Sequence, residues 1–174
     1  KFFQLGYPGG PILDRISKTG DQKAFPFTFP KLRDGSDDFS FSGYKTAAIR
    51  HPQAKTIKPG TQEFNDLIAS FMGSAVNYLL KKTKNAIEKM KPKSLIVAGG
   101  VSRSSMLREK FTAAFENEPV KFYLSSPQYC TDNASMIAWL GYEKYKHFPE
   151  NDYFDFSLNS YPRALFKSIN TKFR

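Results

Sequence analysis

The stretch SLIVAGGVSRSSMLR, at residues 94–108, constrains the fold more than any other part of the chain. A short apolar run ends in Gly99 and Gly100, and an amphipathic run follows within a few residues. This order predicts a buried strand that stops at a glycine pair and continues as a helix. Bare glycine backbone and the free N–H groups of a helix N-terminus suit a nucleotide-type ligand. A tight strand-to-helix turn that needs a positive φ is the alternative explanation for the pair.

The second half of the chain alternates between strand and helix patterns. Apolar runs predict strands at 95–98 and 120–124, a helix between them at about 104–115, and a further helix at about 132–145. A strand, helix, strand order of these lengths is a βαβ unit, so we expect an α/β fold with a partly parallel sheet. Because residues 95–98 are apolar throughout, we expect this strand to be buried on both faces.

The first half contains one clear helix and much irregular sequence. Apolar residues recur at helical spacing from Thr61 to Met90, with Thr61 as the expected N-cap and Pro92 as the expected end. A short helical run is expected at 12–17. The segment 21–44, rich in Phe, Pro, Asp and Ser, is expected to be irregular with short strands around 25–29 and 39–41.

Composition limits the class of protein. A chain of 174 residues forms one or at most two domains, and 17 Phe and 9 Tyr are ample for a packed core. The single cysteine excludes an internal disulfide framework and indicates a reducing compartment. No apolar stretch is long enough for a membrane span, and no signal peptide is visible. The chain starts at Lys1 within an apparently ordered segment, so we expect a fragment or a processed chain.

The net charge of +10 favours an anionic partner such as RNA, DNA or an acidic membrane surface. A generally lysine-rich composition explains the same charge, because most of the basic residues are spread thinly. The one concentration, opposed only by Glu88, could equally be a solvated helix face. It comprises Lys81, Lys82, Lys84, Lys89, Lys91 and Lys93.

Two residues after the second expected strand have the chemistry of a site. Asp132 opens a predicted helix, so it is either an N-cap or a carboxylate near a metal ion or a phosphate. Cys130 is either a soft ligand or a small buried residue. His51 and His147 lack ligand spacing to other residues, so a complete metal site is not expected in this chain. There is no P-loop, nucleophile elbow or paired-carboxylate signature.

Four motifs together resemble one family. They are YPGGP at 7–11, DFSFSGYKT at 38–46, VAGGVSRSSMLR at 97–108 and CTDNASMIAW at 130–139. Taken alone, the second motif indicates only a loop. In this order and spacing, which cover residues 1 to about 146, the motifs are similar to those of the tRNA N6-adenosine threonylcarbamoyltransferases, formerly called O-sialoglycoprotein endopeptidases. DFSFSG followed by a Lys-Thr pair resembles the bacterial and mitochondrial branch.

The resemblance implies a two-lobed fold of the actin, Hsp70 and sugar-kinase type with a cleft between the lobes. Residues 1–174 would be the second, C-terminal lobe, with a helical insert at about 10–60 and an irregular tail at 147–174. The implied reaction transfers a threonylcarbamoyl group from threonylcarbamoyl-adenylate to N6 of the adenosine beside the anticodon. Because a substrate-binding Asp and an HxxxH helix of the first lobe are absent here, the chain alone is expected to be catalytically incomplete.

The resemblance also implies roles for particular residues. Asp132 would ligate one divalent metal ion, Fe or Zn, together with the two histidines of the first lobe's HxxxH helix. Gly10 would touch the substrate, and the backbone of Gly99 and Gly100 would accommodate the adenosine. Ser104 stands where the family has an Asn that contacts the nucleotide, and Ala134 stands where it often has Gly.

The implied partners are tRNA, threonylcarbamoyl-adenylate, the first lobe of the same protein and a second copy in a homodimer, with no membrane. The lysine excess, the single cysteine and the DFSFSG motif favour the mitochondrial matrix over the alternative, a bacterial cytoplasm. Two other functions remain open: a sugar kinase or ATPase of the same superfold, and a non-catalytic tRNA-binding subunit. An HxxxH helix in the missing half would decide for the transferase.

Overall fold

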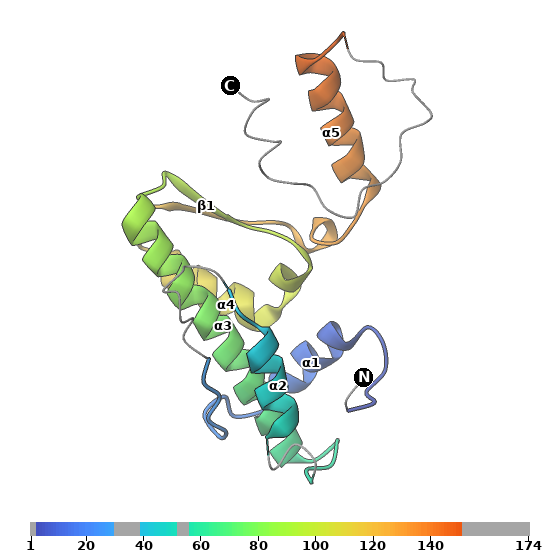
Figure 1. The fold of residues 1–174 in the computed structure, drawn as a ribbon, viewed down its shortest axis with the longest axis vertical. Coiled ribbons are helices and arrows are strands. Elements are labelled where there is room, and N and C mark those ends of the chain that lie inside the picture. Colours follow the sequence, from blue (N-terminus) through green and yellow to red (C-terminus); the bar gives the residue numbers. More distant parts are fainter. Residues whose placement is uncertain (1–2, 30–38, 52–55, 151–174) are drawn as a thin grey trace. The chain divides into compact units, whose positions relative to one another are not determined.

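The computed structural model describes residues 3–29, 39–51 and 56–150. The chain forms two compact units, Lys1–Asp132 and Asn133–Arg174. The described residues of the first unit form a small parallel sheet and four α-helices, and those of the second form one helix (Figure 1). The fold is therefore mixed α/β, as expected. The helices and strands are α1 Gly9–Ser17, α2 Ser42–Arg50, α3 Gln62–Met90, β1 Ser94–Val97, α4 Ser105–Phe115, β2 Lys121–Leu124 and α5 Ala134–His147, with the short 3-10 helices η2 Gly100–Arg103 and η3 Pro127–Tyr129.

Helix α3 is the central element of the first unit, and Figure 1 shows α1, α2 and α4 lying along it. Its N-cap is Thr61, as predicted, whose hydroxyl accepts a hydrogen bond from the Phe64 N–H at 3.2 Å. The helix ends at Met90 because Lys91 adopts a left-handed conformation and Pro92 cannot continue it. No helix in the described part of the chain is long and apolar enough to cross a membrane.

The apolar stripe of α3 supports two separate core clusters. Near its start, Phe64, Leu67 and Ile68 pack with Ile57 and with apolar residues of α1 and the N-terminal segment. Further along, Val76 packs with residues of α4 and with Val120. The predicted helical periodicity is confirmed, and one long helix joins the two clusters. The second cluster comprises Val76, Met106, Leu107, Phe111, Phe115 and Val120.

The segment that follows α1 lies against α3 and forms no strand at 25–29, contrary to the sequence prediction. The Ser70 hydroxyl donates to the Asp21 carbonyl at 2.9 Å and accepts from the Phe25 N–H at 3.1 Å. Aromatic rings continue the contact, since Phe27 meets Phe71 edge-on at 5.7 Å. The backbone thus pairs with the Ser70 side chain of a helix, because no strand among the described residues pairs with it.

The predictions around the DFSFSGYKT motif are also partly wrong. Residues 39–41 form no strand, and the sequence from Ser42 onward is helix α2 where a loop was expected. The hydroxyl of Tyr44, only 2% exposed, donates to the Phe71 carbonyl at 2.5 Å and meets the Ser74 hydroxyl. This tertiary contact holds a short helix of low amphipathicity in place. Asp38, the first residue of the motif, lies outside the described residues.

The sheet consists of β1 and β2, paired in parallel with Ser94 opposite Lys121 and Val97 opposite Leu124. The predicted βαβ unit is therefore confirmed. Leu95, Val97 and Phe122 pack on the cluster shared with α3 and α4. Ile96 on the opposite face is 68% exposed, so the expected burial of β1 on both faces is wrong for the unit 1–132. Helices α3 and α4 cover one face of the sheet, and since successive side chains alternate across a strand, Ile96 lies on the other face.

Candidate functional site

The loops that follow β1 and β2 meet at the carboxyl ends of the two strands. Since Val97 lies opposite Leu124, both strands end at the same level, and the Ser125 N–H donates to the Val97 carbonyl at 3.1 Å. The buried Ser102 hydroxyl donates to the Gly99 carbonyl at 2.7 Å and lies 3.1 Å from Cys130 Sγ. Cys130 is thus a small buried residue that joins the two loops. These contacts bring the two loops together at the carboxyl ends of the strands, where ligands bind in open α/β sheets.

Arg108 of α4 also holds these two loops. Its Nη1 donates to the Ser102 carbonyl at 3.2 Å and to the Ser125 carbonyl at 3.0 Å. One guanidinium therefore fixes the backbone after both strands, and its fixed planar geometry allows both bonds at once. Arg108 belongs to the VAGGVSRSSMLR motif, but nothing in the sequence indicated that it would reach back to these carbonyls.

The two glycines after β1 have different roles. Gly99 has a φ of 90°, a conformation that favours glycine, whereas Gly100 begins the 3-10 helix η2 without a positive φ. A Cβ built on Gly100 meets no atom within 4 Å. The turn therefore accounts for Gly99, but neither packing nor backbone conformation in the described structure accounts for Gly100. The open space beside its backbone is where a ligand can approach closely.

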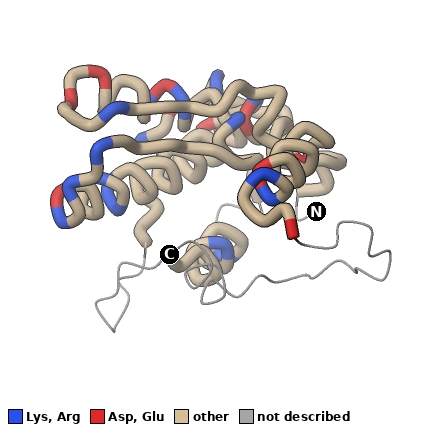
Figure 2. Tube along the Cα trace, turned by 90° about the horizontal axis from the view of Figure 1, so that it is seen from above, with Lys and Arg blue, Asp and Glu red and all other residues tan. Residues whose placement is uncertain are grey.

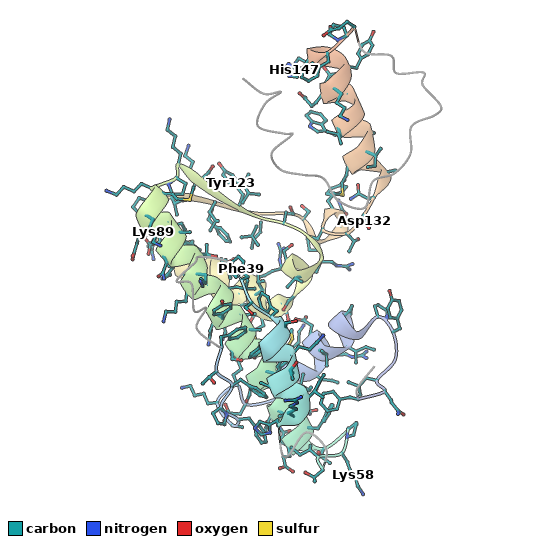
Figure 3. All side chains as sticks on the ribbon, in the orientation of Figure 1. Phe39, Lys58, Lys89, Tyr123, Asp132 and His147 are labelled. Carbon is teal, nitrogen blue, oxygen red and sulfur yellow. The ribbon has the colours of Figure 1, made fainter. Side chains whose placement is uncertain are left out.

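Asp132 is not the N-cap of α5. That cap is Asn133, whose side chain accepts from the Met136 N–H at 3.1 Å. The Asp132 side chain is exposed (Figure 3), and no hydrogen bond or ion pair engages its carboxylate in the described part of the chain. Of the two explanations for Asp132, the structural one is therefore wrong, and the carboxylate is available to a ligand.

One side chain near the strand ends suits the implied metal ion as a ligand. Among the described residues, no three His, Cys, Asp or Glu side chains come together as a metal-binding group. The exposed Asp132 carboxylate fits as one oxygen ligand, whereas Cys130 Sγ is buried among Ser102 and the Ser125 and Ser126 carbonyls. Among the described residues, the strand ends therefore offer one carboxylate to a metal ion, and a complete site would need further ligands.

The N-terminus of α4 is occupied by a carboxylate from α1. Ser104 is the N-cap of α4, and its hydroxyl also donates to Asp14 Oδ1 at 2.7 Å. The Ser105 N–H and hydroxyl donate to the same carboxylate at 3.0 and 2.9 Å. The expectation of unpaired N–H groups at this helix end is therefore wrong for Ser105, because Asp14 takes the place a phosphate would have.

The charge of Asp14 is stabilised by these contacts. Partial burial raises the pKa of its carboxyl group, but the hydrogen bonds from Ser104 and Ser105, with the nearby Lys18, outweigh burial and lower the pKa overall. Asp14 is therefore charged at neutral pH and links α1 to α4. The sequence did not indicate this role of Asp14, since one Asp in a short helical run carries no distinguishing signal.

Gly10 lies at the open end of α1, one turn before Asp14 on the same face. No side chain caps this helix end, and a Cβ on Gly10 would meet nothing within 4 Å. Asp14 hydrogen-bonds to Ser104 and Ser105 and so links α1 to the start of α4, and Gly10 lies four residues before it on α1. The turn at Gly99 and Gly100 is linked to the loop before Asp132 by the contact of Ser102 with Cys130.

Comparison with known proteins decides the family. The family profile described as tRNA N6-adenosine threonylcarbamoyltransferase matches residues 1–139. The chain belongs to this family. Curated proteins of that name include one from Desulfitobacterium hafniense, 38% identical over 91% of this chain, and one from Fervidobacterium nodosum, 44% identical over 87%. A third, from Thermosipho africanus, is 42% identical over 82% of this chain.

The chain spans less than half the length of these threonylcarbamoyltransferase relatives. It covers 46% of the Desulfitobacterium protein, 45% of the Fervidobacterium protein and 42% of the Thermosipho protein. The matched residues 1–139 include Gly10, Gly99, Gly100, Ser104 and Asp132. The family assignment therefore rests on the part of the chain that carries every candidate site residue.

An apolar pocket of about 330 Å³ lies apart from the strand ends, between α1, α2 and α3. Leu13, Phe27, Ile49 and Phe71 are among its lining residues, whereas Gly99, Gly100, Ser104 and Asp132 are not. Lys45 also lines the pocket, and Figure 2 shows Lys and Arg positions spread over several elements of the described chain. The pocket is not part of the candidate site.

Proposed function

We propose that this chain supplies one half of a tRNA threonylcarbamoyltransferase site, formed where β1 and β2 end. The observation that supports this most strongly is the family match over 139 residues that carry an exposed Asp132 and an open Gly100. The donor is threonylcarbamoyl-adenylate, and the acceptor is the adenosine beside the anticodon of tRNA. The relatives named above carry the transferase name, and no observation favours the kinase, ATPase or binding-subunit alternatives.

The proposed reaction needs positioning more than a protein nucleophile. The adenine N6 amine attacks the carbamoyl carbon, the bond from that carbon to the adenylate oxygen breaks, AMP leaves, and the amine loses a proton. The mixed anhydride is already activated, so holding both reactants in line lowers most of the barrier. A reaction of this kind requires no catalytic triad, and no residue of this chain is assigned a catalytic role.

Each residue then has a definite task. Gly100 leaves space for the adenosine, and Gly10 presents open backbone at the start of α1. Arg108 holds the loops after β1 and β2 together through its two hydrogen bonds. Asp14 positions Ser104, whose contact with the nucleotide stays a prediction. Asp132 would hold one divalent ion, Fe or Zn, with histidines of the first lobe. When bound, such an ion polarises the donor and stabilises developing negative charge.

The domain organisation is part of the same proposal. Residues 1–174 form the C-terminal lobe of an actin, Hsp70 and sugar-kinase type fold, with a helical insert at about 10–60 and a tail at 147–174. The parallel β1–β2 pair and the match to less than half of each relative support this division. The first lobe of the same protein is then an obligatory partner, and a homodimer is a further prediction.

The location also remains a proposal. The lysine excess and the DFSFSG motif favour the mitochondrial matrix, while the three named relatives are bacterial proteins and give that location no support. Fusion of the full-length protein to a fluorescent reporter, followed by fractionation of its source cells, distinguishes the matrix from a bacterial cytoplasm.

The decisive experiment replaces Asp132 in the full-length protein. Asp132→Ala should abolish formation of the modified nucleoside and lower the bound metal by about one equivalent, without loss of stability, because its side chain caps no helix. Asn133→Ala is the matched control. It should lose about 1 kcal/mol of stability with the N-cap of α5 and keep its metal. Wild-type metal content and activity in Asp132→Ala would contradict the proposal.

A further inference from the structure

An aromatic cluster at the middle of α3 is not used by the proposed reaction. Three rings stack nearly parallel: Phe29 lies between Tyr44, at 3.7 Å and 12°, and Tyr78, at 4.0 Å and 4°. Phe41 meets Tyr78 edge-on at 5.9 Å and 84°, and Phe39 meets it at 6.2 Å and 79°. Rings from α2, α3 and the segments before α2 thus form one rigid assembly.

The outer side of this assembly faces solvent. Phe39 is 52% exposed and Phe41 is 40% exposed, whereas Tyr44 at the inner side is buried. The two phenylalanine rings lie 6.2 Å apart at an angle of 25° to each other. Held edge-on against Tyr78, they present flat apolar surface to water. Such a surface suits a planar ligand group that stacks.

One lysine and one amide side chain continue from the cluster along the same face of α3. Lys81 and Asn85 follow Tyr78 at i+3 and i+7, so they lie on the helix face that carries this ring, and both are exposed. From Tyr78 to Lys93 the chain has six lysines and one acidic residue, Glu88. In Figure 3, Phe39 lies beside the middle of α3, and Lys89 marks the end of this basic half.

We propose that Phe39, Phe41 and Tyr78, with Lys81, form a stacking platform for single-stranded RNA. A base stacks on the exposed phenylalanine rings while Lys81 contacts the adjoining phosphate. Exposed aromatic rings beside lysines are how proteins bind single strands without reading sequence. Duplex RNA is excluded, because its bases are already stacked on one another. The natural ligand would be an unpaired loop of the substrate tRNA, and this identification rests on the proposed function. The platform would also give the DFSFSG motif a role, since Phe39 and Phe41 belong to it.

The first test uses a matched pair of variants of the full-length protein. Phe39→Leu keeps apolar bulk but removes the ring, and should weaken tRNA binding by roughly 5- to 150-fold. Tyr123→Leu removes a ring of equal exposure, 53%, on β2 and should leave tRNA affinity unchanged. Thermal melting of both variants checks the fold. Unchanged affinity in Phe39→Leu, or an equal loss in both variants, would overturn the platform.

The second test concerns the phosphate contact. Lys81→Ala should flatten the dependence of log affinity on log salt by about 0.7, the value for one single-strand phosphate. Lys58→Ala is the control, because Lys58 is equally exposed but precedes α3 (Figure 3). The same slope for Lys81→Ala as for the wild type would remove Lys81 from the platform.

The third test separates the platform from the proposed function. In a Trp139→Phe background, Phe39→Trp places the one tryptophan of residues 1–174 at the platform, and the fluorescence change relative to the Trp139→Phe parent should show quenching by a 12-nucleotide single-stranded RNA but not by the same RNA as a duplex. Quenching by the duplex alone, or only by vesicles of anionic lipid, would overturn the platform. Transfer to tRNA is assayed separately. Quenching without transfer contradicts the proposed function, and transfer without quenching contradicts the platform.

Discussion

Single residues at the strand ends divide into those that shape the backbone and those that leave room for a ligand. Gly99 has a φ of 90°, whereas Gly100 has no positive φ and no neighbour in the direction of a Cβ. Adjacent glycines therefore serve different purposes. The sequence could predict the pair and its place after a strand, but which glycine the turn requires depends on the backbone conformation.

Substitutions of Gly99 and Gly100 should have different effects on stability and on ligand binding. Gly99→Ala forces a left-handed conformation on an alanine and should cost about 1–3 kcal/mol of stability. Gly100→Ala should change stability by less than about 1 kcal/mol but weaken binding of the adenylate about tenfold, because the new methyl group occupies ligand space. Urea unfolding and calorimetric binding measure the two effects. A Gly100→Ala variant that loses stability and keeps its affinity would make both glycines purely structural.

Asp14 gives a prediction about pH. Its folded-state pKa is lowered, so the stability it contributes is present above the ordinary carboxyl pKa and is lost as the pH falls through the lowered value. Asp14→Asn should therefore cost about 1 kcal/mol at pH 7, and less as the pH approaches 3. Urea unfolding of both proteins across this range checks it. A cost that is independent of pH would show that the charge of Asp14 is irrelevant to its bonds with Ser104 and Ser105.

Elements were predictable where their pattern is local. The periodicity over Thr61–Met90 predicted α3 and its N-cap, and the alternation of strand and helix predicted the parallel pairing of β1 with β2. The segments at 25–29 and 39–41 were mistaken for strands, because aromatic enrichment favours a strand but does not provide a neighbouring strand. Their partners are side chains of α3, such as Ser70 and Phe71, and tertiary contacts of this kind leave no periodic signal.

The close approach of the segment after α1 to α3 can be tested at Gly20. A Cβ at this position would overlap the Asn65 carbonyl and touch the Ala69 side chain. Gly20→Ala should therefore push the segment off α3 and cost about 1–3 kcal/mol of stability. Gly9→Ala, at a helix start with open space, is the control and should cost less than about 0.5 kcal/mol. Equal urea midpoints for the two variants would contradict the close packing.

For the whole molecule, the candidate site is a partial one. The motifs predicted which residues to examine, and the structure brings the loops before Asp132 and after Gly99 together through Ser102 and Cys130. Asp14 and Arg108 could not be predicted, since the partners of Asp14 are distant in sequence and those of Arg108 are backbone carbonyls. One exposed carboxylate cannot hold a metal ion alone, so the proposed site needs ligands that the described residues do not supply.

If the metal ligands come from both lobes, this chain alone should be inactive. Residues 1–174 alone should form no threonylcarbamoyl-adenosine in tRNA, because the proposed histidine ligands are supplied by the first lobe. The full-length protein, assayed with the same adenylate, tRNA and metal, should do so. Mass spectrometry of the digested tRNA measures the product, and tRNA binding by the chain alone should persist if the platform around Phe39 is intact. Robust transfer by the chain alone would show that Asp132, Gly10 and Gly100 form a complete site, and the division of the active site between two lobes would be wrong.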